Sequence, residues 1–197
     1  MYLYVYKFLP QTQVEGPGER ACIYVQGCSI GCEGCITPKS WQEKINHKVK
    51  VKDIAETILQ GPEIEGVTFS GGEPFEQAKT LAKLGNILQK ESLSIVTFTG
   101  HVLENIVKSS NDDWHELLSV TDLLIDGPYM KDKLDLTRPW VGSSNQKYHF
   151  LTKRYQHIQS DINEIPNKIE IRLKDDGEIV INGIVRQKNI EDLLDGI

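Results

Sequence analysis

Three of the chain's four cysteines lie within eight positions, in the stretch QGCSIGCEGCITPKSW that spans residues 26–41. Cys28, Cys32 and Cys35 follow the spacing C-x3-C-x2-C and are interleaved with glycines. Closely spaced cysteines indicate a metal or redox site, and thiolates select zinc or an iron–sulfur cluster. The spacing therefore raises the question of which centre needs three thiolates and no close fourth.

A structural zinc site normally has four protein ligands, so the fourth would have to be Cys22 or His47. Cys22 falls inside a predicted strand, where a free cysteine usually behaves as a small buried hydrophobic residue. His47 lies in a polar stretch and is expected to be exposed. An iron–sulfur cube fits better, because three cysteines on four irons leave one iron with an open position. We expect a substrate to bind at that position.

A second motif follows in the segment GVTFSGGEP, residues 66–74. Gly71 and Gly72 end a predicted strand and let a ligand approach the backbone closely. Glu73 offers a carboxylate that can accept charge-assisted hydrogen bonds from an ammonium group. By itself, Gly-Gly-Glu-Pro is also compatible with a plain strand-to-helix turn. Its position after the cysteine motif favours a binding role.

With both motifs in this order, the chain resembles the radical S-adenosylmethionine (SAM) superfamily. Gly34 stands where the superfamily usually has an aromatic residue, and this variant resembles the activases of anaerobic ribonucleotide reductase. The segments GVTFSGGEPFEQA, IVTFTG, DLLIDGPY and GSSNQ resemble those of the activases in the same order, over about residues 15–150. The chain departs from them in an insertion between Arg138 and Gly142 and in additional sequence after Tyr155.

The resemblance implies two cofactors, a [4Fe–4S] cluster held by Cys28, Cys32 and Cys35 and SAM chelated to the open iron. One electron from the reduced cluster would then split SAM into methionine and a 5′-deoxyadenosyl radical. For Thr99 and Asp126, an ordinary turn is an equal alternative to a binding role. The residues expected to bind the cofactors are Gly34, Cys35, Ile36, Gly71, Gly72, Glu73, Thr99, Asp126, Ser144 and Asn145.

Other polar and aromatic residues receive simpler interpretations. Arg138 is predicted to pair with a carboxylate. His101 is expected to be an exposed residue at the start of a helix. Trp41, Trp114 and Trp140 are expected to be packing residues.

Alternating strands and helices must position these residues. Such alternation predicts right-handed βαβ units and a mostly parallel sheet, and the resemblance makes this α/β fold a partial, open β/α barrel of the radical SAM type. A C-terminal β-hairpin extension is predicted around Asp176-Gly177, with one helical turn in the tail. Strands are predicted at 3–8, 21–27, 65–72, 93–100, 122–127 and 147–155, and helices at 51–61, 74–91, 101–110 and 114–120.

The domain organisation follows from the length and the pattern. The 197 residues are expected to form a single domain with a core over about 15–155 and the hairpin extension over 156–197. The stretch INHKVKVK, residues 45–52, is predicted to be a solvated linker, and 128–146 a long functional loop.

The composition restricts the class of partner. A formal net charge of -6 argues against a nucleic-acid surface, which needs clustered Lys and Arg. No apolar run approaches the ~20 residues of a membrane helix, and the first residues lack the pattern of a signal peptide. The expected location is the cytoplasm, with no membrane partner.

Three functions are compatible with these features. The first is a radical SAM activase that generates a glycyl radical on a partner enzyme, reduced by an electron donor such as flavodoxin. The second is a radical SAM enzyme that modifies a peptide or a small molecule, with the hairpin near 168–182 for recognition. The third is a non-enzymatic iron–sulfur or zinc module.

Overall fold

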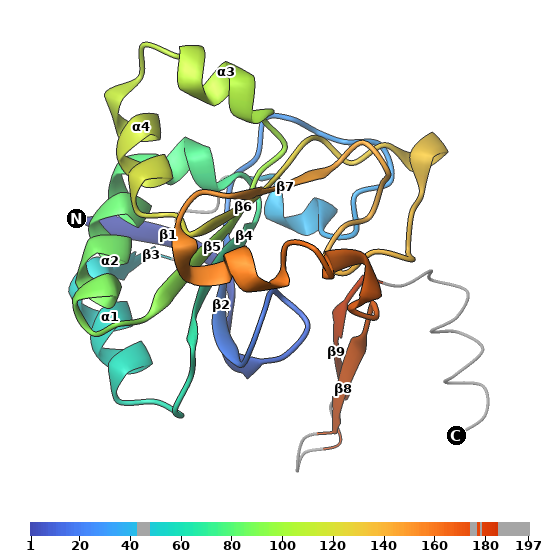
Figure 1. Cartoon of the computed structure of the whole chain (residues 1–197). Coiled ribbons are helices and arrows are strands. Elements are labelled where there is room, and N and C mark those ends of the chain that lie inside the picture. The colour runs from blue at the N-terminus through green and yellow to red at the C-terminus, as the bar shows by residue number, and fades with distance from the viewer. Residues whose placement is uncertain (43–47, 174–176, 178, 185–197) are drawn as a thin grey trace.

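The computed structural model describes residues 1–42, 48–173, 177 and 179–184. A seven-stranded sheet in the order β3-β1-β2-β4-β5-β6-β7 lies at its centre (Figure 1). The four strands β2, β4, β5 and β6 run parallel, and β1, β3 and β7 are antiparallel to their neighbours. The sheet is therefore open, as predicted. The strands are β1 (Tyr2–Thr12), β2 (Arg20–Val25), β3 (Lys48–Lys50), β4 (Gly66–Gly71), β5 (Ser94–Phe98), β6 (Leu123–Asp126) and β7 (Lys147–Phe150).

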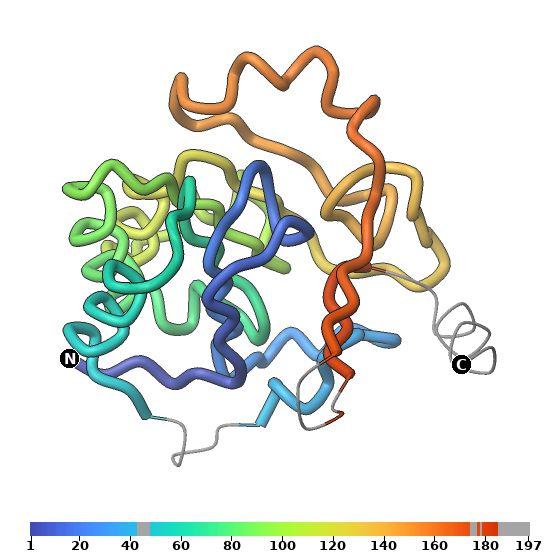
Figure 2. The backbone as a smooth tube through the Cα atoms, turned by 90° about the horizontal axis from the view of Figure 1, so that it is seen from below, coloured from blue at the N-terminus to red at the C-terminus, as the bar shows by residue number. Residues whose placement is uncertain are grey.

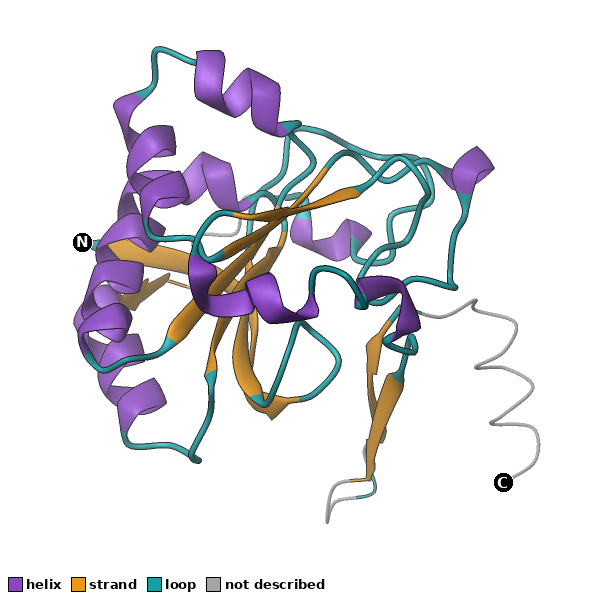
Figure 3. Cartoon of the chain, in the orientation of Figure 1, coloured by secondary structure: helices purple, strands orange, loops and turns teal. Residues whose placement is uncertain are grey.

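In the described part of the chain, four α-helices accompany the sheet and gather on one side of it (Figure 3). The side chains of Val51, Ile54, Ala55 and Ile58 recur at helical spacing and are buried, which explains the predicted helix there. Leu81, Leu84 and Leu88 contribute to the same core from the next long helix. The helices are α1 (Val51–Leu59), α2 (Ala78–Lys90), α3 (Leu103–Lys108) and α4 (Asp112–Ser119).

Short 3₁₀ segments replace parts of two predicted elements. The helix expected from residue 74 begins as the turn η3 (Pro74–Gln77), and α-helix follows only from Ala78. The strand expected over 147–155 ends at Phe150 and is followed by η5 (Lys153–Ile158). The side chain of Thr152 accepts a hydrogen bond from the backbone N–H of Arg154, which caps η5 and ends the strand.

The interpretation of residues 45–52 as a solvated linker was wrong in part. Lys48–Lys50 forms the edge strand β3, paired with β1 through Leu3 and Val49. Val49 is half-buried while both lysines point outward and are exposed. Outward lysines on an edge strand discourage further pairing, so a basic alternating stretch suits this position. Residues 43–47, including His47, lie outside the described residues.

A hairpin of β8 (Ile169–Leu173) and β9 (Ile179–Gly183) forms a separate two-stranded sheet, as predicted. Figure 2 shows this hairpin on the side of the molecule away from the N-terminus. Lys7 Nζ donates to Asn182 Oδ1 at 2.6 Å, and Thr12 Oγ1 donates to Glu170 Oε2 at 2.8 Å. The predicted helical turn of the tail lies outside the described residues. Among those described, no helix is both long and apolar enough to cross a membrane.

The amino ends of the parallel strands are joined by Arg20, which is completely buried. Its guanidinium donates to Thr68 Oγ1 on β4 at 2.8 Å, to Ser94 Oγ on β5 at 3.2 Å and to the Tyr155 hydroxyl at 2.9 Å. A buried charge without enough partners is expensive, so each of these bonds matters. Arg20 therefore fixes the relative position of β2, β4, β5 and η5.

We expect Tyr155→Phe to lower the free energy of unfolding by about 1–2 kcal/mol, because Arg20 and Ser94 both lose a buried partner. Chemical denaturation of the metal-free chain measures this. Tyr2→Phe is the control, since Tyr2 is exposed and its ring keeps the contact with Lys48. Equal stability of the two variants would contradict the role given to Arg20.

Candidate metal centre

The carboxyl ends of the parallel strands meet at one edge of the sheet, where ligands of α/β proteins commonly bind. Cys28 follows β2, Glu73 follows β4, Thr99 follows β5 and Gly127 follows β6. All four line one cavity of about 120 Å³. The predicted site residues among its lining are Cys28, Cys32, Cys35, Gly71, Gly72, Glu73 and Thr99.

The three cysteines of the motif are half-buried, and each sulfur has at least one backbone N–H donor. The amide of Thr37 donates to Cys35 Sγ at 3.4 Å. Burial is the largest effect on the pKa of Cys28 and raises it, while amide hydrogen bonds to its sulfur lower it. The pKa of Cys32 is also raised by burial and lowered in part by an amide hydrogen bond. Amide donors to thiolate sulfur are a standard means of tuning iron–sulfur sites, so this loop suits thiolate ligands.

The donor set fits a cluster better than a single ion. Within the described residues, no three Cys, His, Asp or Glu side chains come close enough together to hold one metal ion. A cube binds each cysteine to a different iron, so its sulfurs lie farther apart than the ligands of one zinc ion.

Cys22 is not available as a fourth ligand. It is completely buried inside β2, where it packs with Leu9 and Tyr24. Burial raises the pKa of its thiol well above the usual value, which is the behaviour of an inert structural cysteine. It does not line the cavity that contains the other three.

Glu73 is a buried and hydrogen-bonded polar residue of the cavity. Its carboxylate is almost completely buried and accepts hydrogen bonds from the amide of Phe75 at 2.9 Å, from Thr99 Oγ1 at 2.8 Å and from the amide of Gly100 at 2.9 Å. Burial raises its pKa to about 7, against the lowering effect of these bonds. Only one of the three bonds reaches Oε2, so this atom can accept one further donor.

Close backbone packing connects the Gly-Gly-Glu segment to the cysteine loop. The Glu73 amide donates to the Gly27 carbonyl oxygen at 2.8 Å. A Cβ atom on Gly72 would lie 2.1 Å from that same oxygen, so no other residue fits there. The order of the two motifs in the sequence thus corresponds to direct contact in the fold.

Five predicted site residues do not line the cavity. Ile36 is 65% exposed. Asp126 Oδ2 accepts from the Leu103 amide at 2.6 Å, at the start of α3, and lies 3.0 Å from His149 Nε2. The remaining three are Gly34, whose neighbours are Tyr129 and Lys131, and Ser144 and Asn145, which bond to backbone carbonyls of the 128–146 loop.

Several cavity residues were missed or given another role. Tyr129 and Phe98 line the cavity although no role was predicted for them. The signal for Tyr129 was its place just after a strand end, in the quoted segment DLLIDGPY. Trp41, expected to be a packing residue, also lines the cavity, and its carbonyl accepts from the Cys28 amide at 3.2 Å.

Three other predictions concern residues around the site. Arg138 pairs with Asp135 at 2.6 Å, as predicted, and the pKa of Asp135 falls to about 2 because of this contact. His101 is half-buried against Trp114 with ring centroids 4.5 Å apart, so its prediction as an exposed residue was wrong. Trp114 and Trp140 pack in the core, as predicted.

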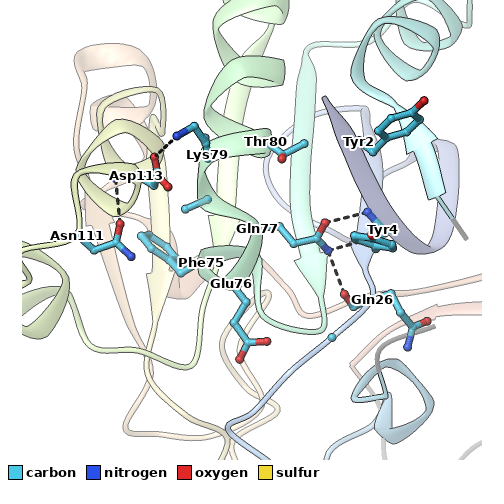
Figure 4. Close-up of a pocket in the computed structure, with 12 residues that line it drawn as sticks. Tyr2, Tyr4, Gln26, Phe75, Glu76, Gln77, Lys79, Thr80, Asn111 and Asp113 are labelled. Atoms are coloured by element: carbon cyan, nitrogen blue, oxygen red, sulfur yellow. Dashed lines mark hydrogen bonds and ion pairs between the residues drawn. The ribbon is translucent and has the colours of Figure 1, made fainter. Parts of the chain in front are cut away.

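A second cavity, of about 460 Å³, is lined by residues of β1, η3 and α2 and by Gln26, among others (Figure 4). It contains none of the cysteines. The smaller cavity therefore remains the candidate site, because it alone collects the thiols and the Gly-Gly-Glu segment within the described part of the chain.

Comparison with known proteins supports a cluster. Residues 14–149 match the family described as 4Fe-4S single cluster domain. The anaerobic ribonucleoside-triphosphate reductase-activating protein of Haemophilus influenzae is 27% identical over 154 residues, which cover 73% of this chain and 95% of that protein. Its namesake from Vibrio cholerae is 28% identical over 158 residues, covering 75% and 97%. Among solved structures, QueE from Escherichia coli is 25% identical with a TM-score of 0.45, covering 51% of this chain and 53% of that one.

We expect single Ala substitutions of Cys28, Cys32 or Cys35 to reduce the iron bound after anaerobic reconstitution to less than about a third of the wild-type amount, because each removes one of only three thiolates. Iron per chain and the visible absorption of the cluster measure this. Cys22→Ala is the control and should bind iron normally. Loss of iron in Cys22→Ala, with normal iron binding in the other three variants, would show that the buried cysteine is a ligand.

Proposed function

Since the chain belongs to the 4Fe-4S single cluster domain family and is a radical SAM-type enzyme, we propose that it is an activase that generates a glycyl radical on a partner enzyme. Its cofactors are a [4Fe–4S] cluster and SAM. When bound, they supply one-electron reductive cleavage and abstraction of a hydrogen atom. Cys28, Cys32 and Cys35 hold the cluster in this proposal, and the other residues bind SAM, orient it and exclude water.

Glu73 is the central SAM-binding residue in this proposal. Glu73 Oε2, which accepts only the Gly100 amide, would accept a hydrogen bond from the ammonium group of the methionine part, and Gly71 and Gly72 would allow that part to approach the backbone. Thr99 contributes by holding Glu73 in place. The aromatic rings of Phe98 and Tyr129, in the lining of the same cavity, limit access of water.

The five predicted residues outside the cavity contribute indirectly. Asp126 fixes the start of α3, and Ser144 and Asn145 hold the loop that carries Tyr129. Gly34 allows Tyr129 and Lys131 to lie against the cysteine loop. Ile36 contributes an apolar surface beside the site.

The observation that carries the activase proposal is the apolar rim of the cysteine loop. Ile36 is exposed, and so are Met130 and Leu134 on the loop that packs against it. The Lys131–Glu33 ion pair of 3.3 Å joins these two loops. Exposed aliphatic side chains beside a reactive centre are typical of a surface that another protein covers. A glycyl-radical enzyme fits this surface, and the relatives named above carry the name of a reductase-activating protein.

The proposal includes a reductant and a location. An electron-donor protein such as flavodoxin reduces the cluster, and the reaction takes place in the cytoplasm, where such donors and reduced cysteines occur. The buried Glu73 and its three donors disfavour a non-enzymatic module, because a scaffold needs no carboxylate beside its cluster.

The hairpin favours a second candidate function, the modification of a peptide. It lies outside the matched residues 14–149. Ile169, Ile171 and Leu173 alternate along β8 and are exposed, so they form an apolar outer face. Such a face suits recognition of an extended apolar peptide.

We expect the reconstituted protein, reduced anaerobically with SAM, to release 5′-deoxyadenosine and methionine, which chromatography quantifies. With an anaerobic ribonucleotide reductase present, electron paramagnetic resonance should show a glycyl doublet on that partner. 5′-Deoxyadenosine without a doublet would favour the peptide-modifying alternative. No 5′-deoxyadenosine, with the cluster intact, would remove the radical chemistry.

We expect Glu73→Gln to raise the SAM concentration for half-maximal cleavage about 10- to 100-fold, because a charge-assisted hydrogen bond contributes ~1.5–3 kcal/mol. The iron content should stay at the wild-type value, since Gln has the same size and keeps one oxygen as acceptor for the Phe75 amide and the Thr99 hydroxyl. Unchanged SAM dependence would show that Glu73 has only the structural role of holding β4 and β5 together.

A further inference from the structure

Glu76 belongs to neither sequence motif, yet it makes the shortest polar contacts of the cysteine loop to another element. Its Oε1 atom accepts two hydrogen bonds from Ser29, one from the backbone N–H at 2.7 Å and one from Oγ at 2.6 Å. Ser29 directly follows Cys28 in the chain. One carboxylate oxygen therefore engages both hydrogen-bond donors of the residue beside the first cysteine.

The turn that carries Glu76 is held independently of Ser29. The Glu76 amide donates to the Glu73 carbonyl at 3.1 Å. The next residue, Gln77, donates to the carbonyls of Tyr4 and Gln26 and accepts from the Tyr4 amide. Figure 4 shows the Gln77 side chain directed at Tyr4 and Gln26, while the Glu76 side chain points away from both. Glu76 is thus aimed at the cysteine loop by a fixed backbone.

Two physical effects of this contact act in the same direction. Hydrogen bonds to cluster sulfurs raise a reduction potential, and negative charge nearby lowers it. Glu76 engages the Ser29 donors, so they are not available to sulfur, and it adds a carboxylate beside Cys28. The carboxylate lies beside this thiolate ligand, because Ser29, which Glu76 contacts at 2.6 and 2.7 Å, directly follows Cys28.

We propose that Glu76 is a positioning residue that fixes the Cys28–Ser29 segment and keeps the reduction potential of the cluster low. This inference rests on the ligation proposed for Cys28, Cys32 and Cys35. A low potential is what reductive cleavage of a sulfonium compound requires. Glu76 acts through Ser29 and its charge, without touching the reacting atoms.

The test is a redox titration of the reconstituted full-length protein without SAM, followed by electron paramagnetic resonance. Glu76→Gln keeps an acceptor for Ser29 and removes the charge. One-electron reduction of the cluster should become about threefold more favourable, which is a rise of ~28 mV in the reduction potential at 59 mV per tenfold change in the equilibrium constant. Glu76→Ala removes both effects and should raise the potential further. Ser29→Ala keeps the charge and the amide bond, so its potential should stay near the wild-type value.

Glu63→Gln is the matched control, because it makes the same change in net charge on an exposed residue before β4, at the opposite edge of the sheet. A potential of Glu76→Gln equal to that of Glu63→Gln, with equal iron content, would overturn the proposal. The titration needs neither SAM nor a partner, so it is independent of the activase proposal. If Glu76→Ala does not bind iron, the comparison of the reduction potentials of Glu76→Gln and Glu63→Gln decides the test.

Discussion

The site depends on one buried carboxylate. Glu73 is nearly inaccessible to water, so its charge must be satisfied by protein donors. Phe75 supplies one at the start of the following turn, and Thr99 and Gly100 supply two at the end of β5. These bonds join the ends of two neighbouring strands, and the Glu73 amide attaches the same point to Gly27 at the start of the cysteine loop. The start of the cysteine loop and the Gly-Gly-Glu segment are therefore held together by direct hydrogen bonds.

The other end of the parallel sheet has a corresponding buried cation. Arg20 connects β2, β4 and β5 at their amino ends through neutral hydroxyl and carbonyl groups. The strands are thus fixed at both ends by a charged side chain with several hydrogen bonds. The charge of Arg20 at the amino ends has only the role of stabilising the fold. The charge of Glu73 at the carboxyl ends lies in the cavity, where it can also bind a ligand.

Sequence reasoning failed where tertiary contacts decide between local alternatives. Lys48–Lys50 has too few apolar residues to indicate a strand. It is a strand because its backbone pairs with the edge of β1. Residues 151–155 continue a strand-like pattern, but Thr152 caps a 3₁₀ turn instead. His101 follows a strand as expected, yet the neighbouring helix α4 supplies Trp114 to cover it. Each outcome depends on a partner distant in the sequence.

The sequence by itself determined the α/β alternation, the hairpin and the cysteine and Gly-Gly-Glu motifs, because hydrophobic period and short-range spacing are local properties. Only the tertiary structure decided which side chains share the cavity. It brought in Tyr129, Phe98 and Trp41, and it left Asp126, Ser144 and Asn145 outside. The pairing of Glu76 with Ser29 joins residues 47 positions apart, so the spacing of the cysteines gave no sign of it. Contacts of this kind arise from the close approach of loops at a sheet edge, which no local pattern encodes.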